Sequence, residues 1–333
     1  MSSAVSSFRW LDLEGAGLSM TERLTLEEAL LKNTQDNWII VGRHSVWPPK
    51  HIIIPHIDDY PESIPTSHKD HKNFRLKTLP SYMQEDAPSP TGMIVMGIGG
   101  KAEKLLNSEN VKEDQLLVVK RFSGGGTVVM DENAIWTTLI AGRKSNEISE
   151  GDDDEISMLC KPYPRDIMKW TADAVVGPTF DKMNELQSQQ EKSLPNFSLK
   201  EDDYVLTLGN SGETRKMGGN AQAITGKQGW LHHTSFLWDY EDVNMERYLK
   251  LPEKRPDYRV DRSHKDFLVK LKEHYGKNGE GPSFFLEAMK EACSHSLKIE
   301  ETNWPSVYDE VFGSDATMNA WWLENRTRIQ HEL

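Results

Sequence analysis

The sequence of 333 residues predicts an α+β fold. Short apolar runs, which are typical of strands, and stretches with helical periodicity follow one another without strict βαβ alternation, and this mixture favours α+β. The composition, with 37% hydrophobic and 27% charged residues, is that of an ordinary globular protein. A chain of this length can bury a sizeable core, and it allows one large domain or two.

The N-terminal region predicts a helix followed by a strand. Apolar residues recur at helical spacing over residues 24–32, with Thr21 as the expected N-cap, and the apolar run 38–41 predicts a strand. Residues 43–91 then hold eight of the sixteen prolines and five of the eleven histidines, without a helical or alternating period. Because these histidines show no repeated ligand spacing, we interpret the segment as a peripheral cap near a site entrance and not as a metal site.

Regular structure is predicted again from residue 93 onwards. We expect strands over 93–98, 116–120, 127–130, 135–141, 204–208 and 230–238. We expect helices over 101–106, 165–186, 264–275 and 283–298. Gly177-Pro178 is a potential break in the second of these helices. The turn at 131–133 suits a hairpin, and residues 187–200 are interpreted as a polar linker.

Charge, cysteine content and hydropathy argue against several classes of protein. The net charge of -13 argues against a nucleic-acid-binding protein, because phosphate contacts need clustered Lys and Arg. The two cysteines, Cys160 and Cys293, are too few for a disulfide framework or a zinc finger. No apolar run approaches the roughly 18 residues of a membrane span. We therefore expect a soluble monomer without nucleic-acid or membrane partners, cytoplasmic or, as the alternative, in a mitochondrion or plastid.

The segment Arg121–Val128, RFSGGGTV, is the first strong candidate for a binding site. Three consecutive glycines between two strands are costly in backbone entropy, and a plain hairpin needs only one or two. They indicate backbone N–H groups that face an anion or a polar head group, beside a fixed cation and two hydroxyls. The candidate residues of this loop are Arg121, Ser123, Gly124, Gly125, Gly126 and Thr127.

A second candidate is Lys216, which stands between two polar, turn-prone segments. A lysine beside glycines can reach a phosphate or carboxylate as a point charge, and neighbouring amide side chains can hydrogen-bond a base or a carbonyl. The candidate residues that follow it are Gly218, Gly219, Asn220, Ala221 and Gln222. Taken alone, such a lysine is more often part of a surface loop.

The strand predicted over 230–238 holds two adjacent histidines. Alternation places His232 and His233 on opposite faces, so that one can point into a site while the other is structural. A nucleophile pair with Ser235 is conceivable, but no nucleophile elbow surrounds this serine. For either histidine taken singly, a core strand with a satisfied side chain is the simpler interpretation.

A competing pattern is G-x-G-x-x-A over residues 97–102, which follows a predicted strand and opens a predicted helix. It is typical of dinucleotide binding, and Lys120-Arg121 at the end of the next strand could hold a 2′-phosphate. The pattern is short and common, and predicted hairpins follow it. A dinucleotide-binding oxidoreductase is therefore the weaker alternative.

Taken together, these stretches resemble the catalytic-domain superfamily of lipoate–protein ligases and biotin ligases, and they look like its lipoate-protein-ligase-like branch in plants and other eukaryotes. RFSGGGTV with a downstream K-x-x-G-x-A-Q is a specific combination, whereas each half alone is weak. The resemblance runs in the family's order through 24–31 (LTLEEALL), 94–101 (IVMGIGGK), 121–128, 216–222 (KMGGNAQ), 231–240 and 248–267.

The resemblance implies a central mixed β-sheet flanked by helices, related to the catalytic core of class II aminoacyl-tRNA synthetases and to biotin ligases. It implies a single catalytic domain over residues 1–300, with the insertion at about 43–91 and a C-terminal tail, 301–333, that packs on the domain. It also implies a reaction in two steps. ATP and lipoate or octanoate give an acyl-adenylate and pyrophosphate, and a lysine of a lipoyl carrier protein then attacks the adenylate to form an amide.

The resemblance also assigns roles to residues. Lys216 matches the family lysine that contacts the phosphate and carbonyl oxygens of the adenylate. His233 and Ser235 join the glycine loop and the K-x-x-G-x-A-Q segment in the acyl- and adenylate-binding set, and Asp203 is the nearest match to a magnesium ligand. Because lipoyl carrier domains are commonly acidic, the surface that faces them should be basic. The residues expected there are Lys250, Lys254, Arg255, Arg259 and Arg262.

The chain departs from bacterial ligases after the glycine loop. Those enzymes continue with His-Asp and then Gly-Asn, whereas this chain has Met130 at the histidine position, keeps Asp131, and has Ala134 at the asparagine position. An alternative is therefore a degenerate family member that binds an acyl or nucleotide ligand, or a lipoyl domain, without turnover. Cys160 and Cys293 lie outside the matched motifs, which disfavours the octanoyltransferases and their cysteine acyl-enzyme.

Overall fold

A computed structural model of the protein describes most of the chain. The described residues are 7–16, 18–43, 92–131, 134–142, 159–187, 194–209, 211–225, 229–251, 255–276, 279–312, 326–330 and 333. The cap predicted over 43–91 lies, apart from its first residue, outside them. No helix in the described part of the chain is long and apolar enough to span a membrane.

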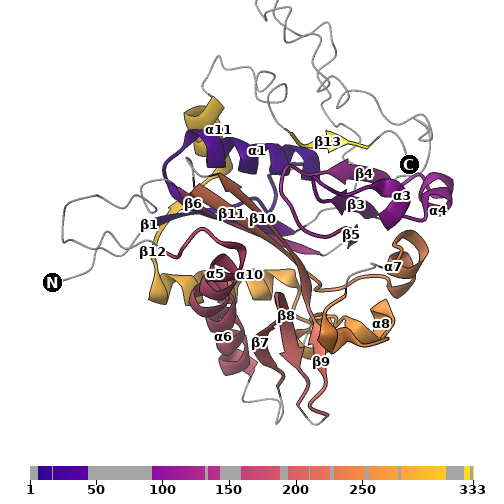
Figure 1. Ribbon diagram of the computed structural model, residues 1–333. Helices are drawn as coiled ribbons and strands as arrows, with labels where there is room; N and C mark the ends of the chain where they lie inside the picture. Colours follow the sequence, from indigo (N-terminus) through magenta and orange to yellow (C-terminus); the bar gives the residue numbers. More distant parts are fainter. Residues whose placement is uncertain are drawn as a thin grey trace, which may run out of the picture.

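A mixed six-stranded sheet forms the centre of the molecule, in the order β10-β11-β6-β2-β1-β12 (Figure 1). β1 runs parallel to β2 and to β12, and the other pairs are antiparallel. The strands are β1 (Ser7–Asp12), β2 (Asn37–Arg43), β6 (Ile135–Gly142), β10 (Gly218–Thr225), β11 (Gly229–Phe236) and β12 (Lys298–Thr302). Strands β2, β6 and β11 agree with the predicted runs, whereas β1, β10 and β12 were not predicted.

Helices cover both faces of this sheet. Helix α1 (Met20–Asn33) lies on one face and helix α10 (Pro282–Ser296) on the other (Figure 1). Alternate residues of β2 divide between them: Trp38 and Ile40 pack into the cluster beneath α1, and Ile39 and Val41 pack into the opposite one. The predicted central mixed sheet between helices is therefore confirmed.

A second sheet, in the order β13-β4-β3-β5, carries the glycine loop between two of its strands. Its strands are β3 (Gly92–Met96), β4 (Leu117–Lys120), β5 (Val128–Asp131) and β13 (Arg328–Ile329). The short helices α3 (Ala102–Leu105) and α4 (Ser108–Glu113) connect β3 to β4. The predicted hairpin at 131–133 is wrong, because β5 pairs with β3 while both edges of β6 are occupied by β2 and β11.

A third sheet, in the order β7-β8-β9, stands beside the edge strand β10. Its strands are β7 (Asn196–Lys200), β8 (Asp203–Thr207) and β9 (Thr214–Lys216). The linker predicted over 187–200 is therefore partly wrong, since residues 196–200 form β7. The side chain of Phe197 accounts for this strand, because it stacks on Phe180 with ring centroids 5.7 Å apart.

The helix predicted over 165–186 is continuous across Gly177-Pro178. It consists of α5 (Pro164–Thr171), the π-helical turn η4 (Ala172–Val176) and α6 (Gly177–Gln187). A proline in a helix deprives the carbonyl four residues earlier of its donor. Here that carbonyl belongs to Ala174, and it accepts a hydrogen bond from Ser296 Oγ at 3.3 Å. The π-turn just before the proline and this outside donor allow the helix to continue.

Two other helix boundaries differ from the predictions. Helix α1 begins after Ser19, whose hydroxyl accepts from Glu22 N while the Glu22 carboxylate accepts from Ser19 N, so the expected cap at Thr21 is wrong. The helix predicted over 264–275 is split, because residues between its two halves pair with strand ends. The halves are α8 (His264–Phe267) and α9 (Lys272–Tyr275).

The remaining elements connect the sheets. They are α7 (Asp242–Tyr248), the 3₁₀ turn η5 (Asp257–Arg259) and α11 (Trp304–Phe312). The C-terminal strand β13 pairs antiparallel with β4. Just before it, the backbone N–H and side chain of Arg326 donate to the buried carboxylate of Glu28 on α1.

Candidate active site

The glycine loop between β4 and β5 is braced from beneath by Arg121. This side chain is 2% exposed, and its guanidinium donates to Ser123 Oγ at 3.0 Å and to the carbonyls of Gly124 and Gly126 at 2.8 Å each. A further bond runs to the carbonyl of Val95. Arg121 therefore supports the loop from within, and these bonds hold its guanidinium beside the glycines.

The same arginine makes the loop electropositive. The four oxygens that accept its hydrogen bonds are neutral, and burial lowers the pKa of its guanidinium to about 10. A guanidinium remains charged at pH 7 under these conditions, and a buried charge among neutral partners favours an anionic ligand. The loop is also tied to the next motif, since Gly124 N donates to the carbonyl of Gln222 on β10 at 2.8 Å.

Lys216 ends strand β9, and the segment after it forms β10, so the interpretation as a surface loop is wrong. The Nζ atom of Lys216 lies 2.5 Å from Oδ1 of Asp203 on the neighbouring strand β8. Oδ2 of Asp203 accepts from the hydroxyl of Tyr258 at 2.9 Å. The backbone of Lys216 is fixed as well, because its carbonyl accepts from Val269 N between α8 and α9.

The antiparallel register of β10 and β11 brings the two downstream motifs together. Gly219 lies opposite Ser235, and Ala221 lies opposite His233. Gly219 is required for this packing, because a Cβ there would lie 2.6 Å from Cγ1 of Val128.

On the other face of this strand pair, a chain of hydrogen bonds links four side chains. Gln222 Nε2 lies 3.0 Å from Nδ1 of His232, whose Nε2 lies 3.2 Å from Oγ1 of Thr234. The hydroxyl of Thr234 donates to Oδ1 of Asn220 at 3.0 Å. Gln222 is thus a support for the structural histidine, and the chain holds the amide of Asn220 in place.

His233 is joined to a residue outside the predicted site set. Its Nδ1 atom lies 2.9 Å from Oε2 of Glu27 on α1, and both side chains are at most 1% exposed. The Nε2 atom of His233 is buried and has no partner among the described residues, and the side chain belongs to the wall of a large cavity. The signal for Glu27 was a glutamate within the apolar pattern LTLEEALL, but no sequence spacing links it to a strand about 200 residues away.

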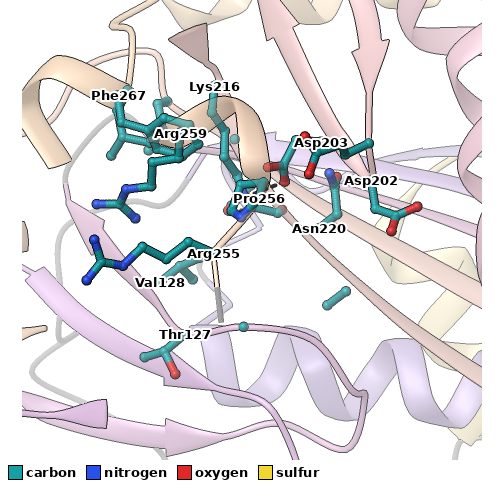
Figure 2. A pocket seen from close by; sticks show the side chains of 18 of the residues that line it. Thr127, Val128, Asp202, Asp203, Lys216, Asn220, Arg255, Pro256, Arg259 and Phe267 are labelled. Atoms are coloured by element: carbon teal, nitrogen blue, oxygen red, sulfur yellow. Dashed lines mark hydrogen bonds and ion pairs between the residues drawn. The ribbon is translucent and has the colours of Figure 1, made fainter. Parts of the chain in front are cut away.

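One cavity of about 970 Å³ collects most of the predicted site residues (Figure 2). Of the predicted residues, those that line it are Arg121, Gly126, Thr127, Asp203, Lys216, Gly218, Gly219, Asn220, Ala221, His233 and Ser235. Four others, Ser123, Gly124, Gly125 and Gln222, do not line it and support the wall instead. Within the described chain, the polar atoms Thr127 Oγ1, Asn220 Nδ2 and His233 Nε2 are buried without a protein partner.

The charge of the cavity is opposite to that of the protein. Among the described residues, seven Lys and Arg but only four Asp and Glu line it, in a chain with a net charge of -13. Of the basic residues expected on a surface that faces an acidic domain, Lys250, Arg255 and Arg259 line the cavity, and Arg259 is only 4% exposed. Lys254 lies outside the described residues. The wall therefore favours an anion, with hydroxyl and amide groups to orient it.

The departures from the bacterial pattern lie away from this cavity. Met130 and Ala134 are buried in the cluster beneath the second sheet, and neither is among the described residues of the cavity wall. Asp131 accepts from Glu241 N and from Asn244 Nδ2, both at 2.9 Å, so it fixes the start of α7.

Gly97 of the dinucleotide-like pattern has a packing role. A Cβ on Gly97 would lie 2.4 Å from the carbonyl oxygen of Gly125, so the residue must be glycine for the two loops to touch. The helix that follows, α3, has only four residues.

The chain matches the family model described as the lipoyl protein ligase A/B catalytic domain over residues 89–298. It is similar to inactive lipoate–protein ligase 2 of Plasmodium falciparum (isolate 3D7), with 25% identity over 252 residues that cover 72% of this chain. The chain spans 59% of that relative's length.

Among solved structures, the fold is similar to that of P. falciparum LipL1 in complex with lipoate (TM-score 0.53, 15% identity, 95% of this chain and 71% of the other). It is also similar to that of a bipartite lipoate protein ligase with its E2 lipoyl domain from Thermoplasma acidophilum (TM-score 0.52, 16% identity, 96% of each chain). The fold is also similar to that of lipoate-protein ligase A bound with ATP (TM-score 0.52, 14% identity, 96% of this chain and 98% of the other). At these identities the likeness concerns the fold, and the resemblance found in the sequence is confirmed.

Proposed function

Because the chain belongs to the lipoyl protein ligase A/B catalytic-domain family, we propose that it activates lipoate or octanoate with ATP and transfers the acyl group to a lysine of a lipoyl carrier protein. The observation that carries this proposal is the common cavity of Lys216 and the glycine loop. Such a cavity can hold two reactants side by side, so that proximity replaces a covalent intermediate with the enzyme.

The residues of the cavity fit these substrates. A carboxylate and a triphosphate are both anionic, and the described cavity wall has an excess of Lys and Arg. The buried polar atoms of Thr127, Asn220 and His233 provide hydroxyl, amide and imidazole groups for the ligand. Apolar side chains complete the wall and suit an aliphatic chain. They are Leu105, Val128, Trp136, Met168, Leu199, Leu237, Met245, Leu249, Phe267 and Leu268.

Lys216 is the group that stabilises charge during the reaction. Activation and transfer both build negative charge on oxygen atoms, and a fixed ammonium beside them lowers the barrier. The ion pair with Asp203 holds Nζ on the cavity wall before substrate arrives. Arg121 contributes a second positive charge through the loop that it braces.

Magnesium is expected to accompany ATP at this site. Mg²⁺ is usually held by one or two carboxylates together with substrate phosphates, and Asp203 is a carboxylate beside Lys216. Over the described residues there is no cluster of three His, Cys, Asp or Glu that could hold a metal ion. The phosphates would therefore supply most of the ligands, which fits a metal that is bound with its nucleotide.

The test combines activation with transfer. Purified protein is incubated with ATP, Mg²⁺ and lipoate or octanoate, pyrophosphate release is measured, and the mass of an added lipoyl domain is then determined. We expect acyl-dependent pyrophosphate release and an acylated domain, unless the acceptor lysine is replaced. Absence of acyl-dependent pyrophosphate release with short and medium acids would contradict the proposal.

A second candidate function is ligand binding without turnover, because the relative from P. falciparum is described as inactive. It is distinguished by a single-turnover experiment with protein in excess over ATP and acid. Tight binding of the acid or nucleotide without pyrophosphate or adenylate would favour this second function. The compartment, cytoplasmic or organellar, remains part of the proposal and is tested by localising the tagged protein.

A further inference from the structure

A second group of cations on the cavity wall comes from a segment outside the glycine loop. The segment that contains η5 contributes Arg255 and Arg259, and their guanidinium groups extend towards the same side (Figure 2). In this view Val128 of the glycine loop lies just below Arg255, and Thr127 lies further below. Neither the glycine motif nor the lysine motif includes these two arginines.

Arg259 is buried with an unused donor. The residue is 4% exposed, its Nε donates to the carbonyl of Arg262 at 3.2 Å, and its Cζ lies 4.7 Å from the ring centroid of Phe267. Its Nη2 atom is buried and has no hydrogen-bond partner among the described residues. Burial lowers the pKa of this guanidinium, and the charges of Arg255 and Arg262 lower it further. A buried cation with an unpaired N–H donor destabilises the fold unless an anion binds to it.

The carboxylates nearby are occupied by other groups. Glu201 accepts from the backbone N–H groups of Asp257 and Tyr258 at 3.0 and 3.1 Å. Asp203 is held by Lys216 and Tyr258, and Asp202 pairs with Arg165 at 3.5 Å. None of these carboxylates is paired with Nη2 of Arg259, and on the described part of the wall Asp257 is the remaining acid.

We propose that Arg259, with Arg255 beside it, forms a phosphate subsite for the diphosphate that leaves ATP. This rests on the proposed function. A carboxylate oxygen of the acid attacks the α-phosphorus, the bond from that phosphorus to the bridging oxygen breaks, and pyrophosphate departs with the electron pair. A planar guanidinium binds phosphate oxygens through two parallel hydrogen bonds, so Arg259 suits the terminal phosphates better than the adenosine or the acid.

The test measures the binding of two probes, inorganic pyrophosphate and AMP, to the full chain by calorimetry. In Arg259→Gln we expect the Kd for pyrophosphate to rise about tenfold or more, since hydrogen bonds to charged groups are strong, with the Kd for AMP changed less than about twofold. The Kd of Arg259→Lys for pyrophosphate should lie between those of the wild type and Arg259→Gln, because lysine keeps the charge but not the paired donors. Arg328→Gln, at an exposed position on β13, is the matched control and should leave both constants unchanged.

Unchanged pyrophosphate binding in Arg259→Gln would overturn the inference. An equal loss for AMP and pyrophosphate, accompanied by a lower melting temperature, would also overturn it, because Arg259 would then only support the segment around η5. If Arg259→Gln still releases pyrophosphate with an unchanged KM for ATP, the subsite is wrong and the proposed function stands. If the wild-type protein binds neither ATP nor pyrophosphate, the proposed function itself fails.

Discussion

The Nδ1 atom of His233 lies 2.9 Å from Oε2 of Glu27, in the buried space between α1 and the six-stranded sheet. The other carboxylate oxygen accepts from Thr138 Oγ1 at 2.7 Å, from Trp136 Nε1 at 3.1 Å and from Arg23 Nε at 3.4 Å. Burial would raise the pKa of Glu27, but hydrogen bonds from His233 and Thr138 and the charge of Arg23 lower it. The carboxylate is therefore charged, and Arg23 supplies its counter-charge.

The contact with Glu27 also determines which ring nitrogen of His233 carries the proton. Burial lowers the pKa of His233, against the opposing effect of Glu27, so the ring is neutral at pH 7. A neutral ring beside a carboxylate carries its proton on Nδ1, which leaves Nε2 as a buried acceptor without a partner among the described residues. Helix α1, far from the motifs in sequence, thus determines what His233 offers to a ligand.

Removal of this carboxylate should be costly. Glu27→Ala leaves Arg23 as an unpaired buried charge, and we expect a loss of about 3–5 kcal/mol in the free energy of unfolding. Urea denaturation measures it. The control is Glu109→Gln on the exposed side of α4, which should change stability by less than about 0.5 kcal/mol. Equal effects of both changes would contradict the assigned role of Glu27.

Stability should fall in mild acid because of His232. Burial lowers its pKa to about 3, whereas an unfolded histidine titrates near about 6.5, so between these values only the unfolded chain binds the proton. We expect this residue to remove about 2 kcal/mol of the free energy of unfolding between pH 7 and pH 5. Urea denaturation of the wild type and of His232→Gln at both pH values tests this, and an identical pH dependence of the two proteins would refute it.

Lys216→Ala should abolish acyl-dependent pyrophosphate release. Loss of one fixed donor to a developing oxyanion typically costs about 10²–10³ in kcat, and the lost ammonium also leaves Asp203 without its ion pair. A pyrophosphate-coupled assay measures the rate. Lys298→Ala, at an exposed position on β12, is the control and should keep wild-type activity. A Lys216→Ala protein that stays folded and fully active would remove the lysine from the mechanism.

The middle glycine of the loop should not tolerate a side chain. Gly125 has φ of +99°, and a Cβ there would lie 2.8 Å from the carbonyl oxygen of Asn220. We expect Gly125→Ala to lose about 1–3 kcal/mol of stability from backbone strain alone, and more from the clash. Gly99→Ala is the matched control, since a methyl group there would meet nothing within 4 Å and its φ lies outside the left-handed region. Thermal unfolding compares the two, and equal melting temperatures would be the contrary result.

Neither cysteine should take part in turnover. Burial raises the pKa of Cys160 to about 12, and likewise that of Cys293 to about 12, so neither forms the thiolate that an acyl-enzyme requires. We expect Cys160→Ala to retain activity, and iodoacetamide not to inactivate the protein. Loss of acyl transfer in Cys160→Ala would instead indicate the octanoyltransferase type of mechanism.

The sequence predicted the parts of this protein that depend on local patterns. Alternation and apolar runs indicated β2, β4, β6, β8 and β11, and helical periodicity indicated α1 and α10. The glycine loop and Lys216 could be singled out because the residue types themselves suit an anion. The strands β1, β7, β10 and β12 were missed, since their pattern is weak and their pairing depends on neighbours that only the fold supplies.

Local sequence alone therefore determined the α+β class, the family resemblance and most of the predicted residues that line the cavity. Tertiary structure decided how those residues act. Burial and long-range hydrogen bonding turn Arg121 into a support for the glycine loop, join Glu27 to His233, and leave Nη2 of Arg259 buried without a partner among the described residues. Each of these outcomes depends on which groups lose their water and on which partners replace it, and both are fixed only when distant segments pack together.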